Sequence, residues 1–248
     1  MKEGTAYGEQ LKRAYARLRA EVPAPEIPPG DDPIYRLALG VLGGGCMELA
    51  ARQAVERLLA RAVDWNDVRV SLPSHLAGQL AGLLPDAPER ARRLTRVLQA
   101  VFERENRLSL DKLRTMPRRE AKQYLEKLDG IDAFTIASVM LWSLGGHAIP
   151  VNQVVFEALR STGLVHPEAG VEEVQAFLER HVPAEEAKAF CLIMEAAAAR
   201  LGAPGSPGKR SARKGSEGKE PAPAKPRRRR PRAQPGPPPV TEEKETPP

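Results

Sequence analysis

The stretch "LEKLDGIDAFTIASVMLWSLGGHAIPVNQVVFEAL", Leu125 to Leu159, decides the fold of this chain. It predicts two helices joined by a tight turn at Gly130, then a loop that ends at Pro150, and then a further helix. The segment "AFTIASVMLWSL" is apolar on nearly every side, which predicts a helix buried on most of its faces. Such a hairpin is a common packing unit of helical cores. It also suits a phosphate site, because its turn and the following helix N-terminus can direct backbone N–H groups at an anion.

The rest of the chain body also carries helical patterns. Apolar side chains recur at helical spacing within residues 7–22, 34–42, 46–63, 75–84, 87–105, 117–128, 152–163, 171–180 and 184–202. Asp32 is placed to cap the second of these helices, with Pro33 at its first position. The one strand-like alternation, Val68 to Leu72, is too short to build a sheet. The sequence therefore predicts an all-α fold.

The positive charge of the chain is concentrated at its C-terminal end. The 248 residues include 38 Lys or Arg and 32 Asp or Glu, a net charge of +6. Residues 203–248 hold 12 of the basic and 5 of the acidic residues, so residues 1–202 are nearly neutral. The same segment holds 12 of the 24 prolines and too few large apolar side chains to offset the entropy of ordering. We therefore expect a helical domain over residues 1–202 and a disordered Pro/Lys/Arg-rich tail over residues 203–248.

The sequence carries no signal for secretion, membrane insertion or metal binding. The first ten residues, "MKEGTAYGEQ", contain no apolar signal-peptide core, and no run of 18 apolar residues would span a bilayer. Cys46 and Cys191 are far apart, and no cysteine pair has metal-ligand spacing. We therefore expect a cytoplasmic protein without a metal site.

The stretch from Leu128 to Leu159 resembles the helix–hairpin–helix DNA glycosylase superfamily, in particular its endonuclease III branch. The family pattern is roughly L-P-G-[VI]-G-x-K-T-A, then an apolar helix, then P-V-D-T-H-V-x-R-[VL]. This chain has L-D-G-I-D-A-F-T-I-A from Leu128 and P-V-N-Q-V-V-F-E-A-L from Pro150. The resemblance extends over roughly residues 5–202. It implies two helical lobes with a DNA-binding cleft between them, and a family activity of DNA glycosylase and AP lyase in base-excision repair.

The departures from this pattern fall on the catalytic positions. In lyase members a lysine amine attacks the sugar C1′, and that position is Phe134, which has no nucleophile. The family's aspartate stabilises the developing positive sugar or activates the attacking group. That position is Asn152, which is uncharged and cannot act as a base near neutral pH. With neither residue intact, the resemblance predicts a catalytically degenerate relative, a pseudoenzyme.

The hairpin departs from the pattern as well. The resemblance places Gly130, Ile131 and Thr135 at the DNA. The family's Pro and second Gly are replaced by Asp129 and Asp132, two carboxylates expected to flank the phosphate site and weaken binding. The polar residue that fills the gap left by an extruded base aligns with Gly45, which has no side chain to insert.

Many relatives hold an iron–sulfur cluster on four cysteines near the C-terminus. The first of these cysteines would fall near Arg200, and no cysteine follows Cys191 in this chain. We therefore expect no iron–sulfur cluster and no other cofactor.

The tail contains the basic run "KPRRRRPR". Its six positive charges would neutralise DNA phosphates, which releases counterions from the DNA. Such contacts do not depend on base sequence. The expected DNA contacts of the tail are Lys225, Arg227, Arg228, Arg229, Arg230 and Arg232. Duplex DNA is thus the expected partner, mainly through the tail, and Pro-rich segments such as "PGPPPV" are suited to docking a protein partner.

Three functions remain open at this point. The first is a catalytically degenerate DNA-binding protein linked to base-excision repair, associated with the nucleoid when bound to DNA. The second is an active glycosylase or AP lyase with relocated residues, Lys127 as the displaced amine and Asp132 as the displaced acid. The third is a protein-interaction scaffold that no longer binds DNA, which the near-neutral body and acidic hairpin favour. A basic cleft would favour DNA binding, whereas an acidic or filled cleft would favour the scaffold.

Overall fold

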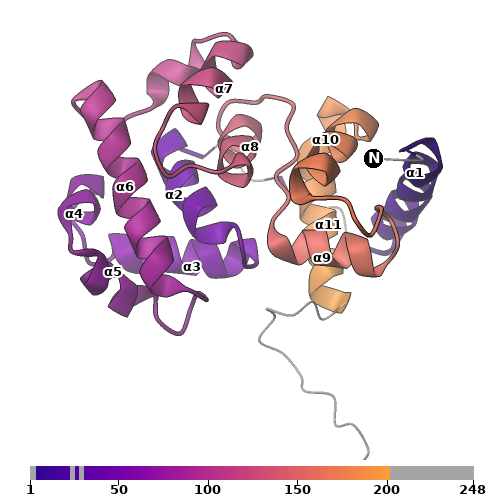
Figure 1. Ribbon diagram of the computed structural model, residues 1–248, viewed down its shortest axis with the longest axis horizontal. Coiled ribbons are helices and arrows are strands. Elements are labelled where there is room, and N and C mark those ends of the chain that lie inside the picture. Colours follow the sequence, from indigo (N-terminus) through magenta and orange to yellow (C-terminus); the bar gives the residue numbers. More distant parts are fainter. Residues whose placement is uncertain (1–3, 23–25, 28–30, 202–248) are drawn as a thin grey trace, which may run out of the picture. The chain divides into compact units, whose positions relative to one another are not determined.

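The computed structural model describes residues 4–22, 26–27 and 31–201, and every regular element within them is a helix (Figure 1). The α-helices are α1 (Gly4–Glu21), α2 (Pro33–Gly43), α3 (Glu48–Leu59), α4 (Trp65–Val70), α5 (Pro73–Leu80), α6 (Ala87–Glu105), α7 (Arg118–Glu126), α8 (Ala133–Trp142), α9 (Gln153–Ser161), α10 (Val171–His181) and α11 (Ala187–Leu201). Two short 3₁₀ helices, η1 (Asp111–Arg114) and η2 (Ala184–Glu186), complete the set. The predicted all-α fold is confirmed. The expected disordered tail, residues 203–248, lies outside the described residues.

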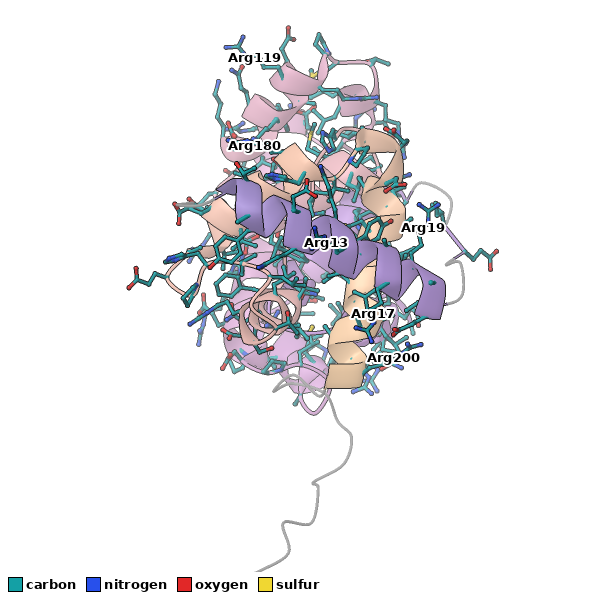
Figure 2. All side chains as sticks on the ribbon, turned by 90° about the vertical axis from the view of Figure 1, so that its right-hand side faces the viewer. Arg13, Arg17, Arg19, Arg119, Arg180 and Arg200 are labelled. Carbon is teal, nitrogen blue, oxygen red and sulfur yellow. The ribbon has the colours of Figure 1, made fainter. Side chains whose placement is uncertain are left out.

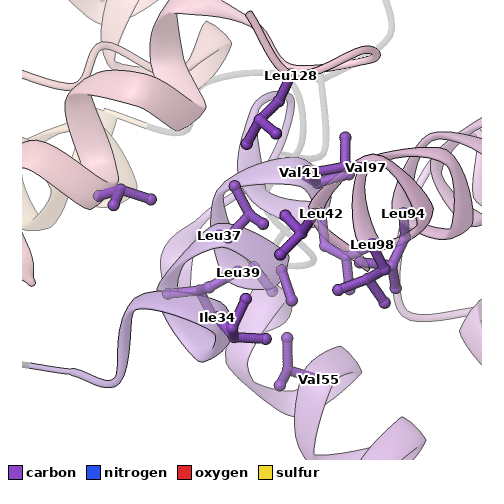
Figure 3. Packing of buried hydrophobic residues seen from close by; sticks show 14 of the residues in the cluster. Ile34, Leu37, Leu39, Val41, Leu42, Val55, Leu94, Val97, Leu98 and Leu128 are labelled. Atoms are coloured by element: carbon purple, nitrogen blue, oxygen red, sulfur yellow. The ribbon is translucent and has the colours of Figure 1, made fainter. Parts of the chain in front are cut away.

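Helix α2 forms the centre of the first lobe, which comprises α2 to α7 and one face of α8. Its start matches the prediction, because the Asp32 carboxylate accepts hydrogen bonds from the N–H groups of Ile34 and Tyr35, each 3.0 Å long, and Pro33 follows the cap. Figure 3 shows its apolar side chains beside those of α3 and α6, among them Ile34, Leu37, Leu42, Val55, Leu94 and Leu98. Each such fully buried side chain stabilises the fold by about 1.5–3 kcal/mol.

Helices α9, α10 and α11 form the second lobe together with α1. Leu11 of α1 is buried against this core, and the ring of Tyr15 meets that of Phe190 edge-on at a centroid distance of 5.1 Å. The opposite side of α1 faces solvent, where Figure 2 shows Arg13, Arg17 and Arg19. An N-terminal helix therefore completes a lobe built mainly from the C-terminal helices.

Helix α8 belongs to both lobes. Ala137, Val139 and Met140 join the first core, whereas Leu141 and Trp142 join the second. This double burial explains why the segment is apolar on nearly every side, as the sequence predicts. It also places the second half of α8 between the two hydrophobic cores.

The strand-like alternation of residues 68–72 does not form a strand. Residues 65–70 form α4, whose first turn is capped by the Asp64 carboxylate through the N–H groups of Asn66 (2.7 Å) and Asp67 (3.1 Å). A local cap thus decides the conformation of this short segment. Among the described residues, no helix combines the length and the apolar character needed to cross a membrane.

Candidate functional site

The predicted hairpin between α7 and α8 turns at Gly130. Its φ of +85° lies in the left-handed region that favours glycine. A Cβ atom here would also lie 3.2 Å from both the Arg96 Cδ and the Val97 Cγ2 of α6. Backbone conformation and close helix approach therefore both require glycine at this turn.

Asp132 has a structural task in the hairpin. It caps α8, accepting hydrogen bonds from the backbone N–H of Thr135 (2.9 Å) and from the Thr135 hydroxyl (2.6 Å). Its second carboxylate oxygen forms a 2.7 Å ion pair with Arg93 of α6. Asp129 lies 3.8 Å from Arg96 in a more exposed pair. Both carboxylates lie at the hairpin as expected, each with an arginine of α6 beside it. The expectation that they weaken phosphate binding stays a prediction.

The three predicted hairpin contacts differ in what they offer a ligand. Thr135 is completely buried, and its hydroxyl is bonded to Asp132, so its side chain positions the hairpin and does not face DNA. Ile131 is half-buried against the first core. Within the described part of the chain, the N–H groups of Gly130, Ile131 and Asp132 have no hydrogen-bond acceptor. These backbone donors remain available to an anion.

Phe134 stands at the second position of α8, facing the turn between α2 and α3. An ideal Cβ on Gly43 would lie 3.5 Å from its ring, and one on Gly44 would lie 3.7 Å from it. The ring is therefore in close contact with this glycine turn. The amine of a lysine at residue 134 would lie where the Phe134 ring lies.

Asn152 is a buried cap, 6% exposed, at the start of α9. Its Oδ1 accepts a 2.8 Å hydrogen bond from the N–H of Val155, and its Nδ2 donates a 3.2 Å bond to the carbonyl of Cys46. Next to it, the N–H of Gln153 donates to the Gly44 carbonyl at 2.9 Å. An aspartate could form the cap but not the bond to Cys46, so the amide joins α9 to the glycine turn of the other lobe.

Phe134 and Asn152 line one cavity, which we call the deep cavity. Arg36, Glu48, Cys191 and Glu195 also line it. Its volume is about 30 Å³, the space of roughly one water molecule. Pockets that enclose small molecules usually measure about 300–1,000 Å³. The two family positions are thus brought together, as predicted, but around a space too small for a nucleobase.

A buried arginine lines the deep cavity. Arg36 of α2 is 2% exposed, and its guanidinium binds both carboxylate oxygens of Glu48, at 3.0 and 3.1 Å. The same group contacts Asp31 (3.2 Å), donates to the Ser138 hydroxyl (2.8 Å) and lies over the Trp142 ring, 4.8 Å from its centroid. Four of its five N–H groups thus have an acceptor among the described residues. This arrangement stabilises a filled site.

The pKa values of two carboxylates that line the deep cavity, Glu48 and Glu195, are shifted in opposite directions. Burial alone would raise the pKa of Glu48, but its hydrogen bonds and charge contacts with Arg36 and Arg52 outweigh burial and lower that pKa below its usual value. Burial raises the pKa of Glu195 to about 7, although the N–H of Glu48 donates to its carboxylate. Glu195 of α11 thus caps the start of α3 across the two lobes.

The nearby thiol is not activated. Burial, reinforced by the Glu195 and Glu48 charges, raises the pKa of Cys191 far above its usual value, so the neutral thiol dominates. The cavity therefore offers neither the amine nor a thiolate nucleophile. Arg36 and Glu195 are not among the predicted site residues, although a charged residue inside the apolar segments "IYRLALGVL" and "CLIMEAAAA" is a signal that the sequence carries.

Phe134 also lines a second pocket, which we call the outer pocket. Its volume is about 330 Å³. It is lined by Gly44, Gly45, Arg90, Arg93, Asp132, Ala133, Phe134, Val151, Gln153, Val171 and Glu172. The hairpin, the glycine turn and the second lobe each contribute to it. This pocket, unlike the deep cavity, has the volume of a small-molecule site.

Gly45 makes room for a buried arginine beside the outer pocket. A Cβ at this position would lie 2.5 Å from the Arg90 Nη2. Arg90 is engaged by the main chain, since it donates to the carbonyls of Leu42 and of Pro85, the latter at 2.8 Å. The missing side chain at residue 45 is therefore explained by packing of Arg90.

The remaining predicted residues lie away from the deep cavity. Lys127 is exposed at the end of α7, and Asp132 lines only the outer pocket, so neither proposed replacement reaches Asn152. The basic run, Lys225 to Arg232, lies outside the described residues. In residues 4–22, 26–27 and 31–201, no group of three or more His, Cys, Asp or Glu side chains is arranged to hold a metal.

The described fold was compared with known proteins. No family model and no curated protein sequence matches the chain. A trapped endonuclease III–DNA covalent intermediate is similar to it, with a TM-score of 0.60, 20% identity, and coverage of 76% of this chain and 84% of that chain. An 8-oxoguanine glycosylase/lyase of Clostridium acetobutylicum in complex with DNA has a TM-score of 0.60 at 15% identity, covering 79% and 70% of the two chains.

A third similar structure is the 3-methyladenine DNA glycosylase of H. pylori bound to 1,N6-ethenoadenine. It has a TM-score of 0.55 at 14% identity and covers 79% of this chain and 97% of that chain. Likeness at such low identity establishes the fold and nothing finer. The chain therefore has the fold of the helix–hairpin–helix DNA glycosylases, arranged around a closed deep cavity.

Proposed function

We propose that this protein binds duplex DNA in a repair-related role and does not excise bases by the chemistry of its structural relatives. The volume of the deep cavity carries the proposal. About 30 Å³ between Phe134 and Asn152 leaves no room for an extruded base. Neither residue supplies a nucleophile or a base near neutral pH.

The hairpin supports the DNA-binding half of the proposal. Three consecutive N–H groups, those of Gly130, Ile131 and Asp132, have no acceptor within the described residues. A phosphate is the natural ligand of such backbone donors. Structures of the same fold have been determined with endonuclease III on DNA, both covalently trapped and non-covalent.

The tail is proposed to supply most of the affinity. The residues Lys225, Arg227, Arg228, Arg229, Arg230 and Arg232 carry six positive charges. Each phosphate that they neutralise contributes about 0.9 to the slope of log affinity against log salt concentration. Binding through the tail would be strong at low salt and indifferent to base sequence.

Cofactor and location belong to the same proposal. The sequence has no cysteine after Cys191, so we expect no iron–sulfur cluster. We also expect a cytoplasmic protein associated with the nucleoid. Absorbance near 400 nm in the purified protein would contradict the first expectation.

The catalytic half is tested with a labelled duplex panel carrying an abasic site, oxidised pyrimidines, uracil or a G·T mismatch. Alkali treatment reveals glycosylase-only products. Wild-type protein should leave every duplex intact. Activity in a Phe134→Lys, Asn152→Asp double variant would indicate that only the chemistry had been lost. Cleavage or excision by the wild type would overturn the proposal and favour relocated residues.

The DNA-binding half is tested by measuring affinity against salt concentration. Replacing Arg227 to Arg230 with glutamine should make the slope of log affinity against log salt concentration shallower by about 3–4. The matched control replaces the same four residues with lysine, which preserves charge, and should retain the slope. An unchanged slope in the glutamine variant would exclude the tail as the main contact.

A protein-interaction scaffold is the second candidate, favoured by the filled deep cavity. The Pro-rich segment "PGPPPV" of the tail would serve as the docking element. Absence of any DNA affinity at low salt, together with a reproducible protein partner, would support this function over DNA binding.

A further inference from the structure

The second lobe contains a groove that the proposed function does not use. It lies between α1 on one side and α9 and α11 on the other, and its volume is about 430 Å³. We call it the α1 groove, and the side chains that line it include Ala14, Arg17, Leu18, Ala158, Met194 and Arg200. Among the described residues, none that lines the deep cavity or the outer pocket also lines this groove. The groove is therefore a separate space with the volume of a small-molecule site.

The lining of the α1 groove is mainly apolar. Ala158 of α9 and Ala198 and Met194 of α11 are buried, and Leu18 of α1 packs beside them on the second core. Four of the lining residues are alanines, whose short side chains leave open the space that larger residues would fill. The Thr162 hydroxyl donates to the Ala158 carbonyl at 2.7 Å, so it already has its partner. The groove thus offers an aliphatic surface to a ligand.

Two arginines lie at the edge of this surface. Arg200, in the last turn of α11, is exposed and has no acceptor among the residues that the structure describes. Arg17 of α1 pairs with Glu21 at 3.0 Å, and both side chains are largely exposed, so the pair contributes little and can exchange for another carboxylate. Figure 2 shows both arginines on the side of the lobe that carries α1. Two guanidinium groups and one carboxylate leave a net positive charge beside the apolar lining.

We propose that the α1 groove binds a free aliphatic carboxylate, with its alkyl chain along the alanines and its carboxylate between Arg17 and Arg200. Guanidinium groups bind carboxylates through paired, charge-assisted hydrogen bonds, and an alkyl chain gains free energy by leaving water. A neutral alkane would leave the arginines without a partner, whereas a compact anion would leave the apolar lining exposed to water. The inference does not depend on the proposed function, because no step of it involves DNA.

A series of fatty acids tests the alkyl half of the proposal. The full-length protein is titrated with hexanoate, octanoate and decanoate by isothermal titration calorimetry, each below the concentration at which it forms micelles. Each added CH₂ group that becomes buried should tighten binding about 4-fold, so octanoate should bind about 15-fold tighter than hexanoate. Equal affinities across the series, or no binding of octanoate at millimolar concentration, would overturn the proposal.

Octanamide tests the carboxylate half, because it has the same alkyl chain as octanoate and no charge. It should bind at least about 10-fold more weakly than octanoate. Arg200→Gln should lower the affinity for octanoate by about 10-fold and leave the affinity for octanamide unchanged. The matched control is Arg13→Gln, since Arg13 is exposed on α1 but does not line the groove. Equal affinities of wild type for octanoate and octanamide would contradict the role of the arginines.

Ala14→Leu tests the location by filling the groove. Ala14 is half-buried and lines it, so the larger side chain should lower the affinity for octanoate at least about 10-fold. Ala16→Leu is the matched control, because it makes the same change on the same helix at a residue that lines a different pocket. It should retain wild-type affinity to within about 2-fold. Thermal unfolding verifies that each variant folds, and the ligand series remains decisive if one does not.

The remaining outcomes identify other occupants. Octanoate binding that survives Ala14→Leu would place the acid elsewhere and overturn the proposal. A concentration-dependent dimer that Ala14→Leu abolishes, in a protein that does not bind octanoate, would assign the groove to a second copy of the chain and overturn it as well. Failure to bind duplex DNA at low salt would overturn the proposed function alone, because octanoate binding should persist.

Discussion

The hairpin and the deep cavity differ in which atoms they present. The hairpin carries two aspartates, and Gly130 turns at a φ of +85° with three N–H groups that have no acceptor in the described residues. The deep cavity is lined by Phe134 and Asn152, with a volume of about 30 Å³. The hairpin thus presents backbone donors, whereas side chains occupy most of the space in the cavity.

The difference follows from which atoms make each site. In the proposed function, backbone N–H groups of the hairpin would bind an anion, so side chains there can differ as long as the turn is preserved. Asp132 even strengthens that turn, since it caps α8 and pairs with Arg93. The catalytic chemistry of the cavity would reside in side-chain atoms, and a single replacement removes it. Substitutions in the cavity should therefore cost more stability than substitutions in the hairpin.

Arg36→Met should produce the largest loss of stability. The change removes the buried guanidinium from Glu48, Asp31 and Ser138, at a cost of about 3–5 kcal/mol. Urea unfolding at neutral pH measures it. Arg17→Met is the matched control, since Arg17 forms an exposed 3.0 Å pair with Glu21 that contributes less than about 1 kcal/mol. Equal losses in the two variants would mean that the arginine does not hold the cavity closed.

The backbone features of both regions were predictable from sequence. The Asp32 cap, the turn at Gly130 and the burial of α8 on most of its faces each follow from residue type and local spacing, and all are present. The meeting of residues 134 and 152 followed from the resemblance, and it too is present. Features that depend on a few neighbouring residues are fixed by local conformational preference.

The side-chain partners were not predictable in the same way. Asp129 and Asp132 lie more than 30 residues from the arginines of α6 that accompany them, and Glu195 reaches the N–H of Glu48 across the two lobes. Such contacts depend on the packing of whole helices. The volume left between Phe134 and Asn152 is likewise a property of the packed fold. The sequence thus indicated that residues 134 and 152 are Phe and Asn, but not how small the space beside them is.

Glu195 should make stability depend on pH. Its folded pKa of about 7 exceeds the usual value of 4.5, so the folded state binds the proton more tightly than the unfolded state. Stability should therefore fall as pH rises from about 5 through 7, by up to about 3 kcal/mol, and level off above. Urea unfolding between pH 5 and pH 8.5 measures this.

Glu195→Gln is the control for this titration. Glutamine still accepts the hydrogen bond from the N–H of Glu48 but does not ionise, so the slope above pH 5 should largely disappear. Starting at pH 5 avoids the opposite contribution of Glu48, whose lowered pKa makes stability fall at more acidic pH. A variant with the wild-type slope would assign the pH dependence to another group.

Asn152→Asp should cost less, about 2 kcal/mol. The new carboxylate keeps the cap on the N–H of Val155 but faces the Cys46 carbonyl without a proton to donate. Asn152→Ser serves as a comparison that retains a capping oxygen without placing a charge in the cavity. If the aspartate variant is as stable as wild type, the amide contact to Cys46 contributes little to stability. Reconstruction of a catalytic site would then be simpler.

Gly130→Ala should have the smallest effect on stability and the largest consequence for the hairpin. Alanine at a φ of +85° is strained, and its Cβ would lie 3.2 Å from the Val97 Cγ2, for a cost of about 1–2 kcal/mol. The control, Gly78→Ala in α5, adds a Cβ with nothing within 4 Å and should stabilise the protein by about 0.5–1 kcal/mol. Since the hairpin donors are backbone groups, a shift of the turn should weaken binding of a paired duplex more than the control does. Equal DNA affinity in the two variants would remove the hairpin from the binding surface and leave the tail as the contact with DNA.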